Sequence, residues 1–158
     1  MHIRHPQQED YYRIITVVND WWGGRSMTGM LPKLFFIHFR DTSFIAEVDG
    51  EIIGFLVGFL SQTYPEEAYV HFLGVHPDFR KQGVALTLYE HFLNEVRKRG
   101  RKTVRLVTVT VNKESIAFHL HIGFEIEPQE TKVDEIPFYQ NYDGLGGDRV
   151  LFVKRLSD

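Results

Sequence analysis

The sequence predicts an α/β fold of the α+β kind, with a mixed and strongly twisted central sheet of about six to seven strands flanked by helices. The first observation is a hairpin signal: Asp49 and Gly50 separate two runs rich in β-branched and aromatic residues, 44–48 and 52–60. The second is a strand, a glycine-containing loop and a long amphipathic helix in direct succession, followed by another β-branched run. A hairpin beside a strand–helix–strand unit is typical of a mixed sheet.

The length of the chain bounds its domain organisation. At 158 residues it can bury one full hydrophobic core, and we expect a single domain over residues 1–158. The 43% hydrophobic and 25% charged residues are close to globular averages.

The charge balance argues against a nucleic-acid partner. The 18 basic and 21 acidic residues give a net charge of -3, so nothing draws the whole chain toward phosphate backbones. The basic run at residues 97–102 is better explained as the cationic last turn of a helix that stops at Gly100.

Several classes of site are excluded by residue usage. The chain has no cysteine, which rules out disulfides, a thiolate zinc site and a cysteine nucleophile. None of the eight histidines is spaced as in a metal site, so no metal is expected. The first residues lack the apolar core of a signal peptide, and no apolar run approaches membrane-spanning length. We therefore expect a cytoplasmic protein with no membrane partner.

The N-terminal part predicts a short strand over residues 1–4 and two helices. Apolar residues at helical spacing indicate the first helix over residues 8–20, and the second is expected over residues 31–39 with a proline in its first turn. Between them, Trp21 and Trp22 precede a glycine pair. They are either core anchors or the wall of a substrate pocket, and core anchoring is favoured for at least one.

The central strand over residues 68–75 leads into the glycine-containing loop. By the period-two rule Tyr69, His71, Leu73 and Val75 share one of its faces. The remaining elements follow the same reasoning. They are a helix over residues 84–99, a strand over 103–111, a helix over 114–122, a strand over 124–127, a long segment with little periodicity over 128–148, and a strand over 149–156.

The loop before the long helix has the chemistry of an anion site. Gly83 lets the main chain approach a ligand closely, and the first N–H groups of a helix point outward with a favourable dipole. Arg80 and Lys81 add positive charge beside them.

Two blocks of sequence resemble those of the GNAT superfamily of N-acetyltransferases. Residues 80–85, Arg-Lys-Gln-Gly-Val-Ala, are similar to its acetyl-CoA motif Gln/Arg-x-x-Gly-x-Gly/Ala, with Ala85 at the second small position. Downstream, Asn112, Ser115, Phe118 and the Gly-Phe pair at residues 123–124 match a second block of the superfamily at the usual distance. The predicted order of elements along the whole chain is similar as well, so the resemblance implies a GNAT-like fold.

The resemblance implies acetyl-CoA as the co-substrate. Main-chain groups around Leu73 and Val75 would pair with the pantetheine arm as an extra strand, residues 81–86 would cradle the pyrophosphate, and the two strands beside the arm would diverge. Asn112 would hold the pantetheine or the divergent strand. The implied cofactor-binding residues are Leu73, Gly74, Val75, Arg80, Lys81, Gln82, Gly83, Val84, Ala85, Leu86, Asn112 and Ser115.

His119 departs from the superfamily pattern. It stands where many members have a tyrosine that protonates the leaving thiolate. A histidine could donate that proton near neutral pH. The alternative, in which His119 only packs or caps a helix end, is equally open.

An acetyl thioester is already activated, so transfer to an amine chiefly needs a deprotonated nitrogen and a polarised carbonyl. Since no cysteine can carry the acetyl group, we expect direct attack in a ternary complex. His71 is the first candidate base because it shares the predicted strand face of Leu73 and Val75. Glu67 and Glu66, acting through water, are alternatives, and His71 could instead be a hydrogen-bonded core histidine.

The acceptor is expected to be a small cationic amine. Residues 127–148 carry six acidic side chains against one lysine, and with Tyr139 and Tyr142 they could form a lid that attracts a cation. A solvated loop with its aromatic rings tucked onto the sheet is the alternative. Trp21 and Trp22 would complete the pocket.

Two other functions stay open at this point: acetylation of a protein or peptide amine, and a non-catalytic acyl-CoA-binding regulatory module. A dinucleotide-binding enzyme is disfavoured because no Gly-x-Gly-x-x-Gly follows a strand. An exposed edge strand would allow a homodimer.

Overall fold

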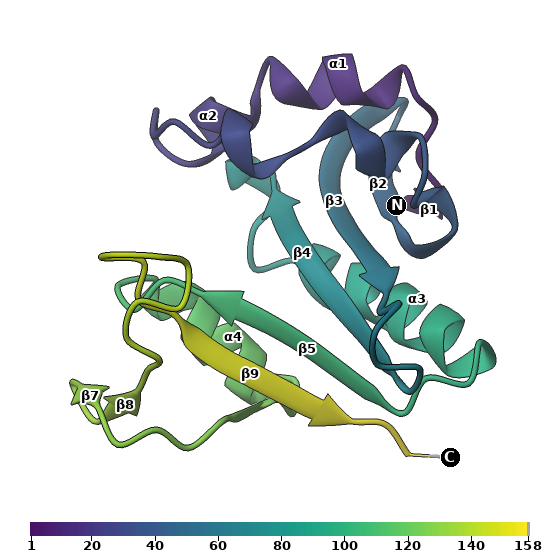
Figure 1. Cartoon of the computed structure of the whole chain (residues 1–158). Helices are drawn as coiled ribbons and strands as arrows, with labels where there is room; N and C mark the ends of the chain where they lie inside the picture. Colours follow the sequence, from purple (N-terminus) through teal and green to yellow (C-terminus); the bar gives the residue numbers. More distant parts are fainter. Residues whose placement is uncertain (158) are drawn as a thin grey trace.

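The computed structural model describes residues 1–157 and shows one seven-stranded sheet with helices on both faces (Figure 1). The strand order is β1-β2-β3-β4-β5-β9-β6, and β4 with β5 is its parallel pair. The predicted mixed sheet is therefore confirmed. Its strands are β1 (His2–Arg4), β2 (Phe44–Val48), β3 (Glu51–Leu60), β4 (Glu67–Val75), β5 (Thr103–Thr108), β6 (Glu125–Ile126) and β9 (Val150–Arg155), and a separate hairpin joins β7 (Lys132–Val133) to β8 (Ile136–Pro137).

The helices divide between the two faces of the sheet and create two hydrophobic cores. The helices are α1 (Asp10–Ile15), α2 (Val18–Trp21), α3 (Val84–Lys98) and α4 (Lys113–His121). Helices α1 and α2 cover the face of β2, β3 and β4, whereas α3 and α4 lie behind the sheet in Figure 1. Among residues 1–157, no helix combines the length and the apolar character that crossing a membrane requires.

The expected continuous helix over residues 8–20 is wrong, because the chain breaks between α1 and α2. At the break the Val17 N–H donates to the carbonyl of Ile14, only three residues back (3.0 Å), and the Thr16 hydroxyl donates to the carbonyl of Arg13 (3.0 Å). These bonds replace the i→i−4 pattern, and the β-branched Thr16 and Val17 are stiff at χ1, which disfavours a helical interior.

The expected helix over residues 31–39 is also wrong. Leu31, Phe35 and Phe36 are buried against α1 and β3, and aromatic side chains lose rotamer freedom in an α-helix. Short 3-10 turns satisfy the burial without a full helix. These turns are η1 (Thr28–Met30), η2 (Lys33–Phe36) and η3 (Arg40–Thr42).

The predicted hairpin between β2 and β3 is confirmed. Asp49 and Gly50 have φ angles of 51° and 80°, so both central residues of the turn are in the left-handed region. A two-residue turn of this kind matches the right-handed twist of the flanking strands.

A β-bulge in β4 changes which side chains share a face. Val57 of β3 lies opposite Phe72, whereas the next residue, Gly58, lies opposite Val70. His71 is therefore the extra residue of the bulge. Beyond it the alternation is reversed: Val70 packs in the α3 core, and Phe72 packs in the α1 and α2 core.

The expectation that His71 shares a face with Leu73 and Val75 is therefore wrong. Leu73 and Val75 pack against the α3 core, whereas the His71 ring stacks on Phe35 at a centroid distance of 4.9 Å on the opposite face. A period-two pattern cannot reveal an inserted residue, because the bulge resets the period.

Replacing Gly58 by alanine is expected to lower the free energy of unfolding by about 1–3 kcal/mol through overpacking. A Cβ at this position would lie 2.6 Å from Cε1 of Phe92 and 2.7 Å from the carbonyl oxygen of Tyr69, beside the bulge. Urea unfolding measures the effect. Gly29→Ala is the matched control, because a Cβ there meets nothing within 4 Å. Equal stability of the two variants would contradict the close packing at Gly58.

Candidate active site

Strands β4 and β5 separate after a short paired stretch. They pair in parallel only at residues 67–69 of β4 and 103–105 of β5. In Figure 1 their starts lie together and their arrowheads point apart. We call the unpaired part, Val70–Val75 of β4 and Leu106–Thr108 of β5, the fork. The expected divergence of these strands is confirmed.

The main chain of β4 offers unpaired groups to the fork. The His76 N–H donates to the carbonyl of Ile53 (2.8 Å), which makes this pair hydrogen-bonded. Because bonded pairs alternate in an antiparallel ladder, Phe72 and Gly74 also bond to β3. The N–H and C=O groups of Leu73 and Val75 then point away from β3 and into the fork, where, among residues 1–157, the Val75 carbonyl accepts a bond from Nε of Arg80 and the other groups stay open. An extended ligand there could form hydrogen bonds like those of an added strand.

The loop after β4 presents the start of α3. After the 3-10 turn η4 (Pro77–Phe79), Lys81 and Gly83 both have positive φ angles, 61° and 82°. The first backbone bond of α3 runs from the Thr87 N–H to the Gly83 carbonyl (3.0 Å). Within residues 1–157, the N–H groups of residues 81–86 have no main-chain acceptor outside the helix. They form the kind of outward-pointing donor set that binds phosphate.

Arg80 fixes the position of this loop. Its Nε donates to the carbonyl of Val75 (3.3 Å), and its Nη2 donates to the carbonyl of Trp21. The guanidinium therefore ties the loop to the end of β4 and to α2. Two of its five N–H donors are used within the protein, so part of its role is to hold the loop in place.

Asn112 and Ser115 lie at the start of α4. The Asn112 Oδ1 accepts the Ser115 N–H (3.1 Å), so Asn112 caps the helix and keeps its amide NH₂ for another acceptor. The Ser115 hydroxyl lies 3.2 Å from Nδ1 of His119. Ser115 therefore faces the interior of the α4 region rather than offering its hydroxyl to the fork.

His119 is a core residue in a fixed protonation state. It is 4% exposed, and its Nδ1 lies 2.7 Å from the carbonyl oxygen of Ser115, so Nδ1 must donate. Its Nε2 then accepts the hydroxyl proton of the fully buried Tyr89 (2.6 Å). Burial lowers the pKa of His119 to about 4, despite the favourable bond to Ser115, and burial raises the pKa of Tyr89. The neutral ring argues against a proton donor and for the packing alternative.

His71 lies at the bulge of β4. Its Nε2 is 2.7 Å from the carbonyl oxygen of Met30, so Nε2 carries the proton and Nδ1 keeps a lone pair. The ring is half-buried and stacked on Phe35. It is thus a hydrogen-bonded histidine, as in the alternative reading, yet one nitrogen stays able to accept a proton.

Glu67, the alternative base, is engaged by an arginine. The Arg105 Nε donates to the Glu67 carboxylate (2.9 Å), and the Arg105 Nη1 donates to Glu127. Glu67 lies at the start of β4, eight residues before Val75, which places it at the closed end of the fork. Glu66 pairs with Lys102 on the surface (3.5 Å). Neither glutamate is as well placed as His71.

The two tryptophans have different surroundings. Trp21 is 4% exposed and packs on Phe55 and His76 at centroid distances of 6.0 Å and 5.6 Å. Trp22 is half-buried, and its ring packs on Phe72 at 5.0 Å. Core anchoring fits Trp21, whereas Trp22 stands beside β4.

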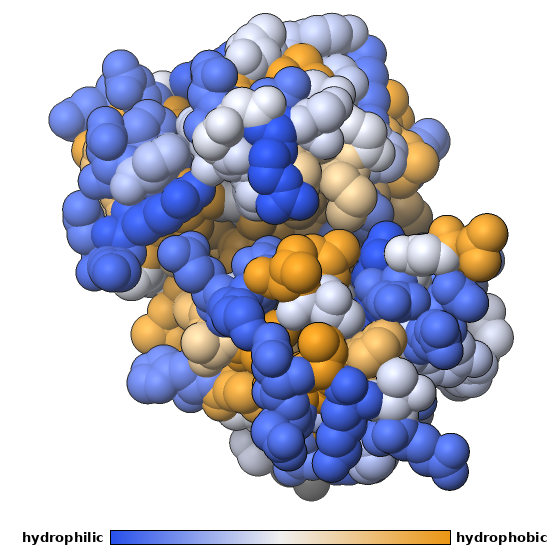
Figure 2. All heavy atoms as spheres, turned by 90° about the vertical axis from the view of Figure 1, so that its left-hand side faces the viewer, coloured by the Kyte–Doolittle hydropathy of each residue, from blue (hydrophilic) through white to orange (hydrophobic). Residues whose placement is uncertain are grey.

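The segment before β9 folds back on itself, so that Tyr139 pairs with Arg149. This pair forms two backbone bonds (2.8 Å and 3.1 Å), and the Tyr139 ring contacts Tyr142 at 5.4 Å. Burial raises the pKa of Tyr69 to about 12, with Tyr142 and Asp143 adding to the effect and Arg149 opposing it. The charges of Asp143 and Arg149 therefore act on Tyr69 of β4. Figure 2 shows the side of the molecule at which β4 and β5 end. Apolar residues gather near the middle of this face, with more hydrophilic residues around them.

Sequence reasoning does not single out Tyr69 or Arg149. It places Tyr69 on a strand face and Arg149 in the last strand. No motif marks them, because the effect of Arg149 on Tyr69 depends on how the segment before β9 folds back.

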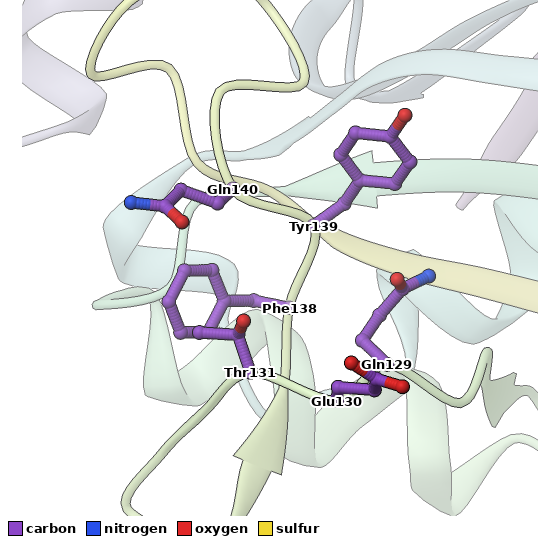
Figure 3. A pocket seen from close by; sticks show the side chains of 6 residues that line it. All are labelled: Gln129, Glu130, Thr131, Phe138, Tyr139 and Gln140. Atoms are coloured by element: carbon purple, nitrogen blue, oxygen red, sulfur yellow. The ribbon is translucent and has the colours of Figure 1, made fainter.

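Two surface hollows lie outside the fork. One, of about 280 Å³, lies between residues 129–131, after β6, and residues 138–140, after β8, and in Figure 3 Phe138 and Tyr139 point to opposite sides of their segment. The side chains therefore do not converge on one point. The other, of about 400 Å³, lies between η3 and Arg99. Within the described part of the chain, no three acidic or histidine side chains are grouped as metal ligands.

Gly83→Ala is expected to raise the dissociation constant for acetyl-CoA about tenfold. The backbone at Gly83 has φ of 82°, and an added Cβ would stand in open space at the start of α3, where the phosphates are expected. Isothermal titration calorimetry measures the change.

Gly100→Ala is the matched control for this measurement. Gly100 has φ of 80°, also has no atom within 4 Å of an added Cβ, and follows the other end of α3. It carries the same backbone strain but faces no ligand. Equal weakening of acetyl-CoA binding in both variants would show that strain alone is responsible.

The neutral His119 makes stability depend on pH. The unfolded chain takes up a proton below a pKa of about 6.5, whereas the folded protein does so only near pH 4. Stability is thus full above pH 6.5 and falls as the pH drops toward 4, by about 2 kcal/mol at pH 5 from this residue. His119→Gln should lack this part of the loss, measured by urea unfolding at pH 7 and pH 5. The exposed His121→Gln is the control, and an unchanged pH dependence in His119→Gln would refute the assignment.

Comparison with known proteins gives the family. The family model described as Acetyltransferase (GNAT) family matches residues 8–124. The L-2,4-diaminobutyric acid acetyltransferase of Nocardia farcinica is 27% identical over 82% of this chain and 67% of its own length. The [ribosomal protein bS18]-alanine N-acetyltransferase of Escherichia coli K12 is 31% identical over 54% of this chain and 55% of its own length. Matches cover from 40% to 92% of the curated relatives' lengths.

A solved structure shares the fold. Ard1 from Thermoplasma volcanium superposes with a TM-score of 0.79, over 99% of this chain and 98% of that one, at 22% identity. The GNAT-like fold predicted from the sequence is therefore confirmed. Because the family model covers more than half of the chain, the chain belongs to the Acetyltransferase (GNAT) family and is an N-acetyltransferase that takes its acetyl group from acetyl-CoA.

Proposed function

We propose that this chain transfers the acetyl group of acetyl-CoA to a small cationic primary amine by direct attack in a ternary complex. The carrying observation is the fork: unpaired main-chain groups lead from the start of α3 along β4 to His71 at the bulge. A donor bound along this line would bring its thioester close to a nitrogen base. The chain has no cysteine to hold an acetyl group, which supports a single transfer step.

The donor would be bound mainly by the backbone. The N–H groups of residues 81–86 suit the pyrophosphate, and the groups of Leu73 and Val75 suit the amides of pantetheine. A β4 N–H that faces the fork, as at Val75, would polarise the thioester carbonyl. Asn112 keeps an amide donor at the end of β5 for the pantetheine arm.

His71 would act as the general base. Its Nδ1 lone pair is available because Nε2 donates to Met30. An alkyl ammonium with a pKa of about 10.4 must lose a proton before it attacks, and Nδ1 would take that proton directly or through a water molecule. The nitrogen then forms a bond to the carbonyl carbon, the carbon–sulfur bond breaks, and coenzyme A leaves as a thiolate. The second proton of the attacking nitrogen passes to this thiolate, directly or through solvent.

The departing thiolate needs no dedicated acid from the core. A thiol with a pKa of about 8.5 is a good leaving group near neutral pH, and solvent at the mouth of the fork can protonate it. This supports a mechanism in which His119 has a packing role, as its bonds to Tyr89 and Ser115 indicate.

The acceptor is proposed to enter over Tyr69. The aromatic rings of Tyr69 and Tyr142, with the Asp143 carboxylate near them, suit the hydrocarbon and the charge of an alkyl ammonium. One relative is named for acetylating a free diamino acid and another for a ribosomal protein alanine. A peptide amine is the second candidate. We favour a small molecule because the segment before β9, which carries Tyr142 and Asp143, would leave less space for a peptide beside Tyr69.

The experiment is release of free coenzyme A with a panel of amines. Since the chain has no thiol, a thiol reagent reads coenzyme A against no protein background. Release with small amines supports the proposal, and release with an N-terminal peptide alone would favour the peptide alternative. Thermal stabilisation by acetyl-CoA without release from any acceptor would favour a non-catalytic module.

His71→Gln is expected to lower kcat about 100-fold, because the variant has no proton acceptor at the bulge. The dissociation constant of acetyl-CoA should stay at the parent value, since the donor is bound by the backbone. Steady-state kinetics and calorimetry measure the two quantities.

His38→Gln, which changes an exposed histidine, is the control. A kcat of His71→Gln equal to that of the parent at every pH would rule out His71 as the base.

A further inference from the structure

Arg149 shares a face with the acceptor side of the fork. Strand β9 pairs with β5 so that Val153 lies opposite Arg105. Side chains alternate along a strand, and Val150 and Phe152 are buried in the α3 core. Arg149, which directly precedes β9, therefore lies on the opposite face with Val153 and Arg105.

Tyr69 lies on that same face. It is the parallel partner of Arg105, and partners in a sheet project to the same side. The positive charge of Arg149 and the negative charge of Asp143 both act on the Tyr69 hydroxyl. The Tyr69 hydroxyl therefore feels both a cation and a carboxylate, although the backbone of Arg149 lies toward the open end of β5, next to the Val150–Thr108 pair.

The Arg149 side chain is held in place and keeps hydrogen-bonding capacity. Its Nε lies 2.9 Å from Oδ2 of Asp143, its Nη1 donates to the carbonyl of Asp148 (2.8 Å), and its backbone pairs with Tyr139. Within residues 1–157, Nη2 has no hydrogen-bond partner. A guanidinium whose Nε and Nη1 are held in place while Nη2 keeps its N–H donors can bind a carboxylate through Nη2.

A fixed cation at this point is hard to reconcile with an acceptor that is only cationic. An ammonium group beside Arg149 would be repelled, and the half-exposed Asp143 already pairs with Arg149. A molecule with both charges avoids this problem. Its carboxylate can bind Nη2 of Arg149 while its ammonium group faces Asp143 and the tyrosine rings.

We propose that Arg149 binds a carboxylate of the acceptor, so that the acceptor is an amino-acid-like molecule with a primary amine and a carboxylate rather than a plain diamine or polyamine. This inference rests on the proposed function, since it specifies the class of small amine that the same site takes.

The test uses pairs of acceptors that differ only in the carboxylate. Suitable pairs are 2,4-diaminobutyrate with 1,3-diaminopropane, ornithine with putrescine, and lysine with cadaverine. Coenzyme A release gives kcat/KM for each. In at least one pair, kcat/KM for the amino acid should exceed kcat/KM for its diamine by about tenfold or more, as expected for a charge-assisted hydrogen bond.

The variants assign this preference to Arg149. Arg149→Gln should lower the ratio of kcat/KM between amino acid and diamine about tenfold, through a higher KM for the amino acid. Arg155→Gln is the matched control: it lies on the same strand and, by alternation, the same face, but at the far end of β9, and should keep the parental ratio.

A third variant separates carboxylate binding from simple tethering of the segment. Asp143→Asn removes the ion pair but leaves the guanidinium, so it should keep the preference for the amino acid. If Asp143→Asn lowered the ratio as much as Arg149→Gln, Arg149 would act only by holding the segment, and the inference would be overturned.

The outcomes distinguish this inference from the proposed function. Equal turnover of diamines and amino acids would leave the proposed function standing and overturn the role of Arg149. Release of coenzyme A with no member of any pair would overturn both.

Discussion

The separation of β4 from β5 after three residue pairs is the constraint on which the rest of the structure depends. In a continuous sheet β5 would satisfy the inward groups of Leu73 and Val75. A buried amide left without a partner costs about 1–3 kcal/mol, so the N–H groups of Leu73 and Val75 need a ligand or water. The bulge at His71 adds a further local distortion, and the neighbouring Thr42 and Ser43 hydroxyls bond the carbonyl and N–H of Gly58 opposite it (2.7 Å and 3.3 Å). The fork is therefore a supported feature with its polar groups directed at a binding site.

The two hydrophobic cores lie on opposite faces of the sheet, and the core under α3 joins β4 to β5 and β9. The core under α3 contains residues of β5 and β9 together with Val70 of β4. Phe72 of β4 packs in the core under α1 and α2. Arg80 links them, since it bonds both the end of β4 and Trp21 of α2. The phosphate-binding loop, the bulge and the acceptor side are thus positioned by packing and main-chain bonds. Few charged side chains are required to bind the donor.

The local geometry of the proposed donor site could be predicted from the sequence, because it depends on short-range patterns. Gly83 at the start of an amphipathic helix and Asn112 at the start of another are recognisable within a few residues. The dependence on main-chain groups also helps, because strand alternation places them without knowledge of side-chain contacts. The error at His71 has the opposite origin: one inserted residue resets the alternation, and no residue type announces it.

The acceptor side could not be predicted to the same depth. Tyr69 and Arg149, whose charge acts on it, are eighty positions apart in the sequence, and the position of Arg149 depends on an irregular segment. His119 shows the converse limit. Its position in a motif suggested a catalytic group, but its surroundings, Tyr89 and the Ser115 carbonyl, are set by packing between α3 and α4. Burial then lowers its pKa and removes the proton that the proposed role required.

The most direct test of the central claim, that the fork binds acetyl-CoA through the main chain of β4, is residue-resolved amide hydrogen exchange by NMR with and without acetyl-CoA. The amides of Leu73 and Val75 and those of residues 81–86 should become protected on binding. The amides of Phe72 and Gly74, which already bond to β3, should change little and serve as internal controls. Unchanged exchange at Leu73 and Val75 in the presence of saturating acetyl-CoA would contradict the account.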